Sequence, residues 1–418
     1  MGRVILTYSY PQFNIKQALC YNVSAMSNLA ASGLYDVLIV GAGPVGSYIA
    51  YRLAGSGHSV IVFEEHQRIG EPMQCTGIVG AECLKRFPLF DGTVLREVDS
   101  ARLFSPSGKE IRLWRDEAQA YVIDRTAFDR SIAEKAQSQG AKYFTGCRVK
   151  RIGVVDGRVK AETEGGATYE AKAAAIASGF YSRIPQRLGL GRVRDFVVGA
   201  QAEVTANNLS EIEVYFNQEI APGFFAWLVP TTPKRALVGL FCRSNPVGHL
   251  RNLLSSLFEA GKIDSPNVRI TPGGIPLNPL RKTYRDRVLV VGDAAGQVKP
   301  TTGGGVYYGL LCADIAADTL IRAIDTDNFS EKLFAEYQKA WRHLIGAELR
   351  TGYIARRIYE KRSNRQIDHL FNTIESKGIH QSLLKSRDVS FDWHRKAIIK
   401  SLQYVGPWRP IFARGGKA

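Results

Sequence analysis

A glycine-rich turn near the start of the chain has the spacing of a phosphate-binding site. Gly41, Gly43 and Gly46 follow the apolar run 36–40 and precede a predicted helix. The first glycine permits a tight turn, the second lets backbone N–H groups approach a pyrophosphate, and the third lets the helix pack closely on the strand. Glu64 ends the next apolar run, where its carboxylate can accept hydrogen bonds from both ribose hydroxyls. The spacing predicts a dinucleotide site, and NAD and FAD both fit it.

A second pattern of strand, turn and helix lies about 250 residues further along the chain. The apolar run 287–291 is followed by Asp293 and then by the glycines 303–305, which precede a predicted helix. This resembles the second FAD motif of the flavin-dependent hydroxylase and reductase superfamily. In that superfamily the aspartate bonds the ribityl chain, and the positive end of the helix faces the N1–C2=O edge of the flavin and stabilises its reduced form. An NAD-binding domain has no use for this element, so the resemblance implies FAD.

Two shorter segments agree with the FAD motifs. Residues 124–129 resemble the DRxxFD segment that begins a helix beside the cofactor, and residues 176–179 stand where the superfamily has an ADG or ATG turn, with Ser178 as the departure. No second G-x-G-x-x-G follows a predicted strand. A nicotinamide donor, NAD(P)H, would therefore bind only transiently, and a small iron–sulfur protein such as ferredoxin is an equally open source of electrons.

Two further segments narrow the resemblance to one family. Residues 71–80, EPMQCTGIVG, look like the Cys-containing loop of geranylgeranyl reductases, especially the archaeal-type digeranylgeranylglycerophospholipid reductases. Residues 222–230, PGFFAWLVP, resemble the YxWxFP substrate motif of that family, with Phe225 in place of the tyrosine and Val229 in place of the phenylalanine. The change at Phe225 removes a hydroxyl group. The resemblance covers about residues 35–375.

The resemblance implies a set of site residues. The implied FAD-binding residues, with the glycines of the first turn, are Gly41, Gly43, Val45, Gly46, Glu64, Cys75, Thr76, Ile78, Arg125, Val149, Asp293, Gly305 and Val306. The implied substrate-binding residues are Phe225, Trp227 and Pro230. Cys75 is the candidate catalytic residue, although a cysteine in a loop can also be a small apolar filler. The six cysteines form no CxxC pair, and no metal-binding spacing appears.

The implied reaction is the saturation of isoprenoid double bonds in a geranylgeranyl lipid or diphosphate that serves as a membrane lipid precursor. Such alkenes have no adjacent carbonyl group, so hydride delivery from flavin N5 must be coupled to protonation of the other carbon. Trp227 and Phe225 could offer ring faces to the cationic charge that develops. The acid stays open between Cys75, a flavin-bound water and another residue. A monooxygenase or halogenase with an apolar substrate and an electron-transfer flavoprotein that reduces a quinone share the FAD motifs.

The chain has 418 residues, of which 45% are hydrophobic and 22% charged, which excludes collagen-like, disordered and coiled-coil proteins. We predict an α/β fold with a Rossmann-like FAD-binding domain, an inserted antiparallel-sheet substrate domain and a helical C-terminal region. Residues 1–34 are expected to be a leader, which is either disordered or the product of an over-long start before Met26. The predicted FAD-binding domain comprises 35–96, 115–190 and 281–325, the substrate domain 97–114 and 191–280, and the C-terminal region 326–418.

The net charge of +16 is concentrated near the C-terminus. Residues 331–418 contain 18 Lys and Arg against 8 Asp and Glu, a net of +10. Aromatic residues are interleaved with these charges at Trp393, Tyr404, Trp408 and Phe412. The pattern favours peripheral contact with an anionic membrane surface, and a basic helix docked on the fold is the alternative. We expect a cytoplasmic protein on the inner face of the cell membrane that binds no nucleic acid, because no recognition motif accompanies the charge.

Overall fold

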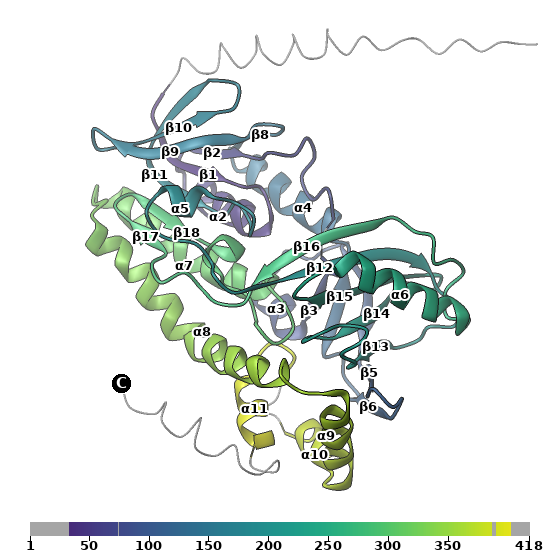
Figure 1. Ribbon diagram of the computed structural model, residues 1–418. Coiled ribbons are helices and arrows are strands. Elements are labelled where there is room, and N and C mark those ends of the chain that lie inside the picture. The colour runs from purple at the N-terminus through teal and green to yellow at the C-terminus, as the bar shows by residue number, and fades with distance from the viewer. Residues whose placement is uncertain (1–32, 74, 387–389, 403–418) are drawn as a thin grey trace, which may run out of the picture.

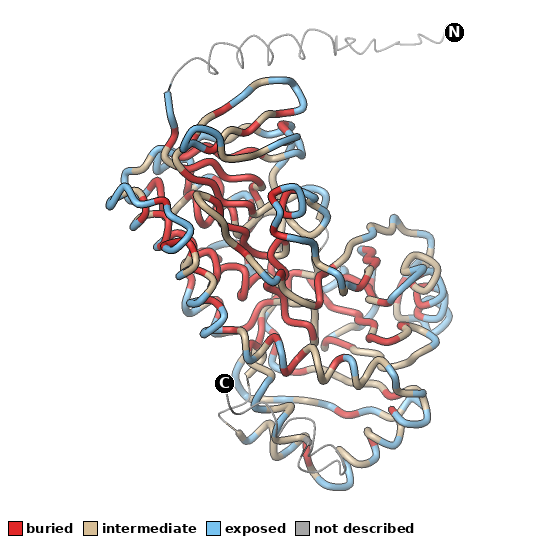
Figure 2. The backbone as a smooth tube through the Cα atoms, turned by 60° about the vertical axis from the view of Figure 1, so that its left-hand side comes forward, coloured by how far each residue is buried: buried red, intermediate tan, exposed pale blue. Residues whose placement is uncertain are grey.

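The computed structural model describes residues 33–73, 75–386 and 390–402. Figure 1 shows two large sheets side by side, with the long helix α8 running beneath both and the last helices gathered at its far end. The most deeply buried backbone lies in the two sheets and in the helices pressed against the first of them (Figure 2). The expected leader, residues 1–34, lies outside the described residues except for its last two residues. The first strand begins at Tyr35.

The first sheet carries the dinucleotide-binding pattern. Its main path is β17-β18-β11-β1-β2-β8, with a hairpin of β9 and β10 attached to β11, and β1 pairs in parallel with both β11 and β2. The apolar runs 36–40 and 287–291 and the run that ends at Glu64 contain strands of this sheet, as predicted. Its strands are β1 (Tyr35–Val40), β2 (Val60–Phe63), β8 (Lys142–Phe144), β9 (Val149–Val155), β10 (Arg158–Thr163), β11 (Thr168–Ile176), β17 (Tyr284–Arg285) and β18 (Val288–Val290).

Three helices pack together against this sheet and join it to the glycine turns. The contact between α2 and each of the other two is extensive, and Leu53, Ile132 and Leu310 are fully buried in the shared core. Asp124 caps the second helix by accepting a hydrogen bond from the N–H of Ala127, as the DRxxFD resemblance implies. The three helices are α2 (Pro44–Gly55), α4 (Arg125–Ser138) and α7 (Val306–Asp325).

The second sheet has the order β16-β12-β15-β14-β13-β5-β6 and is antiparallel except where β13 pairs with β5. Helix α6 (Pro246–Glu259) packs on one face of it through Leu250, Leu253 and Leu254. The sequence did not predict β16, because Pro272 and the glycines beside it resemble a loop. The strands are β5 (Ser100–Phe104), β6 (Glu110–Trp114), β12 (Phe196–Thr205), β13 (Ile212–Tyr215), β14 (Ala226–Thr232), β15 (Arg235–Cys242) and β16 (Ile270–Pro276).

A small third sheet lies between the two large ones and holds the cysteine loop in place. Its order is β3-β7-β4, and the N–H of Ile123 bonds the carbonyl of Gly77 at 2.8 Å. Two short elements complete this part of the fold, the helix α5 (Ile184–Arg187) and the 3₁₀ turn η1 (Gly292–Ala295). The strands of the small sheet and the helix that follows it are β3 (Ile78–Gly80), β4 (Val94–Val98), β7 (Ala120–Ile123) and α3 (Ala81–Arg86).

The described part of the C-terminal region is mainly helical, as predicted. Helix α8 (Glu331–Tyr359) buries Phe334, Tyr337, Trp341 and Ile345 at the three- and four-residue spacing of one helix face. It is followed by α9 (Asn364–Ser376), α10 (Ile379–Leu384) and α11 (Arg395–Leu402). Of the aromatic residues expected to contact a membrane surface, Tyr404, Trp408 and Phe412 lie outside the described residues. Over the ranges that the structure describes, no helix is long and apolar enough to cross a membrane.

Candidate active site

One continuous cavity joins the glycine turns of the first sheet to the inner face of the second. It encloses about 1480 Å³. Sites for one small molecule enclose about 300–1,000 Å³. The cavity is therefore large enough for a dinucleotide and a second, apolar ligand at the same time.

The first glycine turn forms one end of this cavity. A β-carbon on Gly43 would have no atom within 4 Å, so the backbone there faces open space that a phosphate can approach. Gly41 has a φ of +102°, which favours glycine, and its position against the backbone of Ala177 leaves no room for a side chain. Gly46 does not line the cavity, because a β-carbon there would overlap the carbonyl oxygen of Gly41. Its role is the close packing of α2 on β1.

Glu64 lies at the end of β2 with its carboxylate held in one orientation. Oε2 accepts a 2.9 Å hydrogen bond from the N–H of Ala42, and Oε1 accepts one of 2.9 Å from the N–H of His66. The carboxylate lines the cavity beside the glycine turn. Oε1 also lies 2.7 Å from Nδ1 of His66, whereas Oε2 has a second lone pair, so the side chain can still accept a hydrogen bond from a ligand through Oε2.

Asp293 lies in η1, directly after β18, and points its carboxylate toward the same cavity. Among the described residues no group donates a hydrogen bond to this carboxylate, and burial raises its pKa above the ordinary value while the charge of Arg125 opposes the rise. Asp293 is only partly buried, so its carboxylate oxygens are open to the cavity and can accept hydrogen bonds there. A ligand that carries hydroxyl or N–H groups could donate the missing hydrogen bonds to this carboxylate. The ribityl chain of FAD carries such hydroxyl groups.

Arg125 begins α4 and joins that helix to the cysteine loop. Its Nε and Nη2 atoms each lie 3.0 Å from the carboxylate oxygens of Asp129, and the guanidinium also faces the sulfur of Cys75. Burial would lower the pKa of Arg125, but Asp129 and Cys75 together outweigh it and the net shift is upward. Cys75 accepts a 3.4 Å hydrogen bond from the N–H of Gly77. The arrangement places a thiol beside a permanent positive charge at the cavity wall.

The other end of the cavity is an aromatic chamber, formed by Phe224, Phe225, Trp227 and Phe241. The rings of Phe225 and Trp227 have centroids 6.0 Å apart at 63°, and those of Trp227 and Phe241 are 5.0 Å apart. Gly239 on the neighbouring strand makes room for the indole. The indole N–H is buried and bonds no acceptor among the described residues.

Alternation along β14 decides which residues reach the chamber. Phe225, Trp227 and Val229 line it, whereas Ala226 and Leu228 face the opposite side and pack toward α6. Pro230 follows the second set and is not among the cavity residues. Substrate binding by Pro230 stays a prediction.

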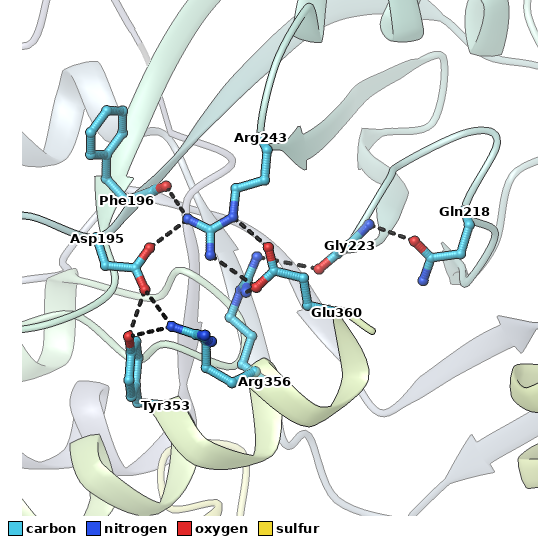
Figure 3. A network of polar contacts seen from close by, with 9 residues as sticks. Asp195, Phe196, Gln218, Gly223, Arg243, Tyr353, Arg356 and Glu360 are labelled. Carbon is cyan, nitrogen blue, oxygen red and sulfur yellow. Dashed lines mark hydrogen bonds and ion pairs between the residues drawn. The ribbon is translucent and has the colours of Figure 1, made fainter. Parts of the chain in front are cut away.

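A polar network on α8 holds the loop that carries this aromatic motif (Figure 3). Arg356 donates from Nη2 to the carbonyl of Gly223 at 3.2 Å, and its guanidinium lies 4.7 Å from the centre of the Phe224 ring. Glu360 accepts from Arg356 at 2.8 Å and from Nη2 of Arg243, at the end of β15, at 2.9 Å. Arg243 also pairs with Asp195. The chamber is therefore braced by the C-terminal end of α8.

Comparison with known proteins decides the family. A family model described as lycopene cyclase protein matches residues 36–376. The digeranylgeranylglycerophospholipid reductase of Methanocaldococcus jannaschii is 33% identical over 81% of this chain and 90% of that protein. Reductase 2 of the same name from Methanopyrus kandleri is 32% identical over 85% of this chain and 94% of that protein. The chain belongs to the digeranylgeranylglycerophospholipid reductase family.

Solved structures agree with this assignment at the level of the fold. A geranylgeranyl bacteriochlorophyll reductase-like protein from Thermoplasma acidophilum superposes with a TM-score of 0.78 and 22% identity, covering 88% of this chain and 96% of that one. The predicted α/β fold class is confirmed. Because the family consists of FAD-dependent oxidoreductases, the chain is an enzyme of that class.

The structure brings together nearly all of the residues that the family resemblance implied. Gly46 and Pro230 are the two that do not line the cavity. The remaining residues that line it are Gly41, Gly43, Val45, Glu64, Cys75, Thr76, Ile78, Arg125, Val149, Phe225, Trp227, Asp293, Gly305 and Val306.

The residues of the cavity wall that sequence reasoning did not single out include Gln201, Phe241 and Arg356. Gln201 had a recognisable signal, since a glutamine inside an apolar strand run faces either a partner or a ligand. Phe241 and Arg356 had none, because their positions depend on how distant elements pack.

Proposed function

We propose that this enzyme saturates the isoprenoid double bonds of geranylgeranyl chains in membrane lipid precursors. The observation that carries the proposal is the single cavity in which the dinucleotide turn opens onto an aromatic chamber. An apolar chain in that chamber lies next to whatever the glycine turns bind. The names of the two relatives point to the same substrate class.

The residues fit FAD as the cofactor. The open space at Gly43 suits a pyrophosphate, Glu64 suits a ribose, and the Asp293 carboxylate lacks the donors that a ribityl chain would supply. The start of α7 at Val306, after the glycines 303–305, presents a positive helix end to the same space. When bound there, FAD would supply a hydride from its N5 atom.

The aromatic chamber would exclude water and stabilise the charge that develops in the alkene. Protonation of the less substituted carbon, running ahead of hydride delivery, leaves positive charge on the more substituted carbon in the transition state, and the hydride then adds to that carbon. The ring faces of Trp227 and Phe225 are negative, and a cation–π contact contributes about 0.5–2 kcal/mol. These rings favour the transition state over the neutral alkene, which is the condition for raising kcat.

Cys75 is the proposed proton donor. Its thiol would give a proton to the second alkene carbon, so the π bond is replaced by two C–H bonds and the sulfur becomes a thiolate. The guanidinium of Arg125 faces that sulfur and would stabilise the charge left on it. Cys75→Ala should lower kcat about 100-fold or more while FAD content is unchanged, since a positioned acid contributes about 10²–10⁴-fold. Cys312→Ala, which removes a thiol fully buried in α7 away from the cavity, is the matched control.

The electron donor is proposed to be either NAD(P)H in transient contact or a small iron–sulfur protein such as ferredoxin. The test is anaerobic reduction of the yellow protein by each donor in turn, followed by the loss of flavin absorbance. Rapid reduction by one donor at micromolar concentration assigns it. Failure of both donors would contradict this part of the proposal.

We also propose peripheral contact with an anionic membrane through α11. This helix exposes Arg395, Lys396 and Ile399, a mixture of charge and apolar surface suited to lipid headgroups. Each basic residue near an anionic surface contributes about 1 kcal/mol. Reversing the charge of Lys396 and Lys400 to Glu should reduce binding to phosphatidylserine vesicles at least tenfold. The same reversal at Lys234 and Lys332 is the control and should leave binding unchanged.

The reductase assignment competes with a monooxygenase or halogenase of the same fold. Donor oxidation should be measured with digeranylgeranyl lipid, with and without oxygen. A reductase consumes donor in proportion to lipid when oxygen is absent. Turnover that stops without oxygen, with an oxygen atom added to the product, would assign the oxygenase instead.

A further inference from the structure

The segment 391–395, the carboxyl-terminal clasp, lies beyond the part of the chain that the family model matches, which ends at residue 376. Phe391 nevertheless lines the cavity, and the clasp is anchored by buried polar contacts. Asp392 is 2% exposed; burial raises the pKa of its carboxyl group, and the nearby backbone of Cys83 and Glu82 at the start of α3 opposes the rise. Gly80 leaves the space for this carboxylate.

The clasp meets the loop that follows Asp293 through a buried lysine. Lys299 is 4% exposed, donates a 3.0 Å hydrogen bond to the carbonyl of Phe391 and lies 3.8 Å from Oδ1 of Asp392. The backbone of Lys299 also closes the loop, since its N–H bonds the carbonyl of Gly304 at 3.1 Å and its carbonyl accepts from Gly303 at 2.9 Å. One residue thus joins the clasp to the glycine turn at the cavity wall.

A second contact fixes the same loop. The ring Nε2 of His394 lies 2.8 Å from the carbonyl of Phe391, so this nitrogen carries the proton and Nδ1 is the acceptor. Nδ1 lies 2.7 Å from Oγ1 of Thr301, which therefore donates its hydroxyl proton to the ring. Burial lowers the pKa of His394 to about 3, with the charge of Lys299 acting in the same direction, so the ring is neutral at physiological pH.

We propose that Lys299 and the clasp are positioning residues for the flavin. The clasp holds residues 299–305 in the conformation that receives the ring system, and the ammonium group of Lys299 provides positive charge behind Gly304. Its Nζ lies 3.5 Å from where a β-carbon of Gly304 would be, and Gly304 lines the cavity. Negative charge on the reduced cofactor would be stabilised by this cation as well as by the start of α7. This inference rests on the proposed FAD cofactor.

The test measures FAD affinity and the flavin midpoint potential of the full-length protein carrying Lys299→Met or Asp392→Asn. Each variant should bind FAD about tenfold or more weakly, because each one loosens the glycine turn. Lys299→Met should also shift the midpoint potential to a more negative value, because it removes a cation, whereas Asp392→Asn removes an anion and should not shift the potential in that direction. Lys282→Met, which breaks the exposed pair with Glu331, is the matched control and should change neither quantity.

Two results would overturn the proposal. If both variants bind FAD as tightly as the wild type, the clasp does not position the flavin. If both variants have the same midpoint potential, the charge of Lys299 does not stabilise the reduced flavin. If either variant fails to fold, Thr301→Val supplies the test, since it keeps the side-chain shape and removes only the hydroxyl that bonds His394. It should weaken FAD binding about threefold or more. Neither readout uses lipid, so loss of lipid turnover would fault the proposed function and leave this inference standing.

Discussion

The hydroxyl of Thr76 donates a 2.6 Å hydrogen bond to Oε1 of Gln201, which joins the cysteine loop to a strand of the second sheet. Gln201 is 7% exposed and lines the cavity, as Thr76 does. The bond ties the candidate acid at Cys75 to the wall that receives the substrate. The hydrogen bond therefore fixes the position of the cysteine loop relative to the second sheet.

Breaking this bond should disturb catalysis more than folding. Gln201→Leu removes the acceptor for Thr76, so we expect kcat to fall about tenfold, at a stability cost of about 1 kcal/mol. Gln201→Glu restores an acceptor and should recover most of the rate. Steady-state kinetics with digeranylgeranyl lipid and urea unfolding measure the two quantities. Equal losses of rate in both variants would argue against the role of this bond.

Asp293 should determine cofactor affinity. Asp293→Ala removes the carboxylate that has no donor of its own among the described residues, and with it the charge-assisted hydrogen bonds that we propose it accepts from the ribityl chain. Hydrogen bonds to a charged group are worth about 1.5–3 kcal/mol, which corresponds to an FAD affinity about 10–100-fold weaker. Titration of the flavin-free protein with FAD, followed by fluorescence, measures it. Asp318→Ala, on the exposed side of α7, should bind FAD as the wild type does.

Trp227 should act mainly on the rate. Trp227→Leu keeps an apolar chamber but removes the ring face, so kcat should fall about 3–30-fold with little change in KM, in line with a cation–π contribution of about 0.5–2 kcal/mol. Trp227→Phe keeps a ring face and should lose less. A change confined to KM would show instead that the indole only shapes the chamber.

The ion pair of Glu360 should make stability depend on acidity. Hydrogen bonds from Arg243 and Arg356 lower its pKa from 4.5 to about 2. Since the folded value is the lower one, the stabilisation is complete above about pH 4.5 and is lost as the pH falls toward 2. Glu360→Gln should therefore cost about 1–2 kcal/mol at pH 6 and nearly nothing at pH 2. Urea unfolding at both pH values tests this. Glu331→Gln, in an exposed pair, should cost about 0.5 kcal/mol or less throughout.

Local chemistry explains what the sequence could predict. The turn at Gly41, the strand before it and the cap at Asp124 each depend on residues within a few positions, so spacing alone determines them. We predicted that residues 97–114 belong to the second sheet, because two short strands can pair at the edge of an existing sheet. The sequence pattern failed at β16, where Pro272 and two glycines look like a loop but belong to a strand that pairs with residues 196–202 of β12.

The rest depends on contacts between distant segments. Side chains alternate between the two faces of β14, so Trp227 lines the cavity and Pro230 lies on the other face. The family motif does not show which of its residues share a face. Arg356 and Lys299 read in sequence as ordinary basic residues of a helix and a loop. Their roles depend on hydrogen-bond partners more than 90 residues away in the chain, Gly223 for Arg356 and Phe391 for Lys299.

One anaerobic measurement tests the central claim most directly. The purified yellow protein is photoreduced, digeranylgeranyl lipid in detergent is added, and flavin absorbance and lipid mass are followed together. We predict that the flavin reoxidises as the lipid gains mass in steps of two hydrogens, and that Cys75→Ala slows both events equally. A flavin that stays reduced beside unchanged lipid, and reoxidises only when oxygen is admitted, would contradict the assignment of this chain as a reductase of isoprenoid double bonds.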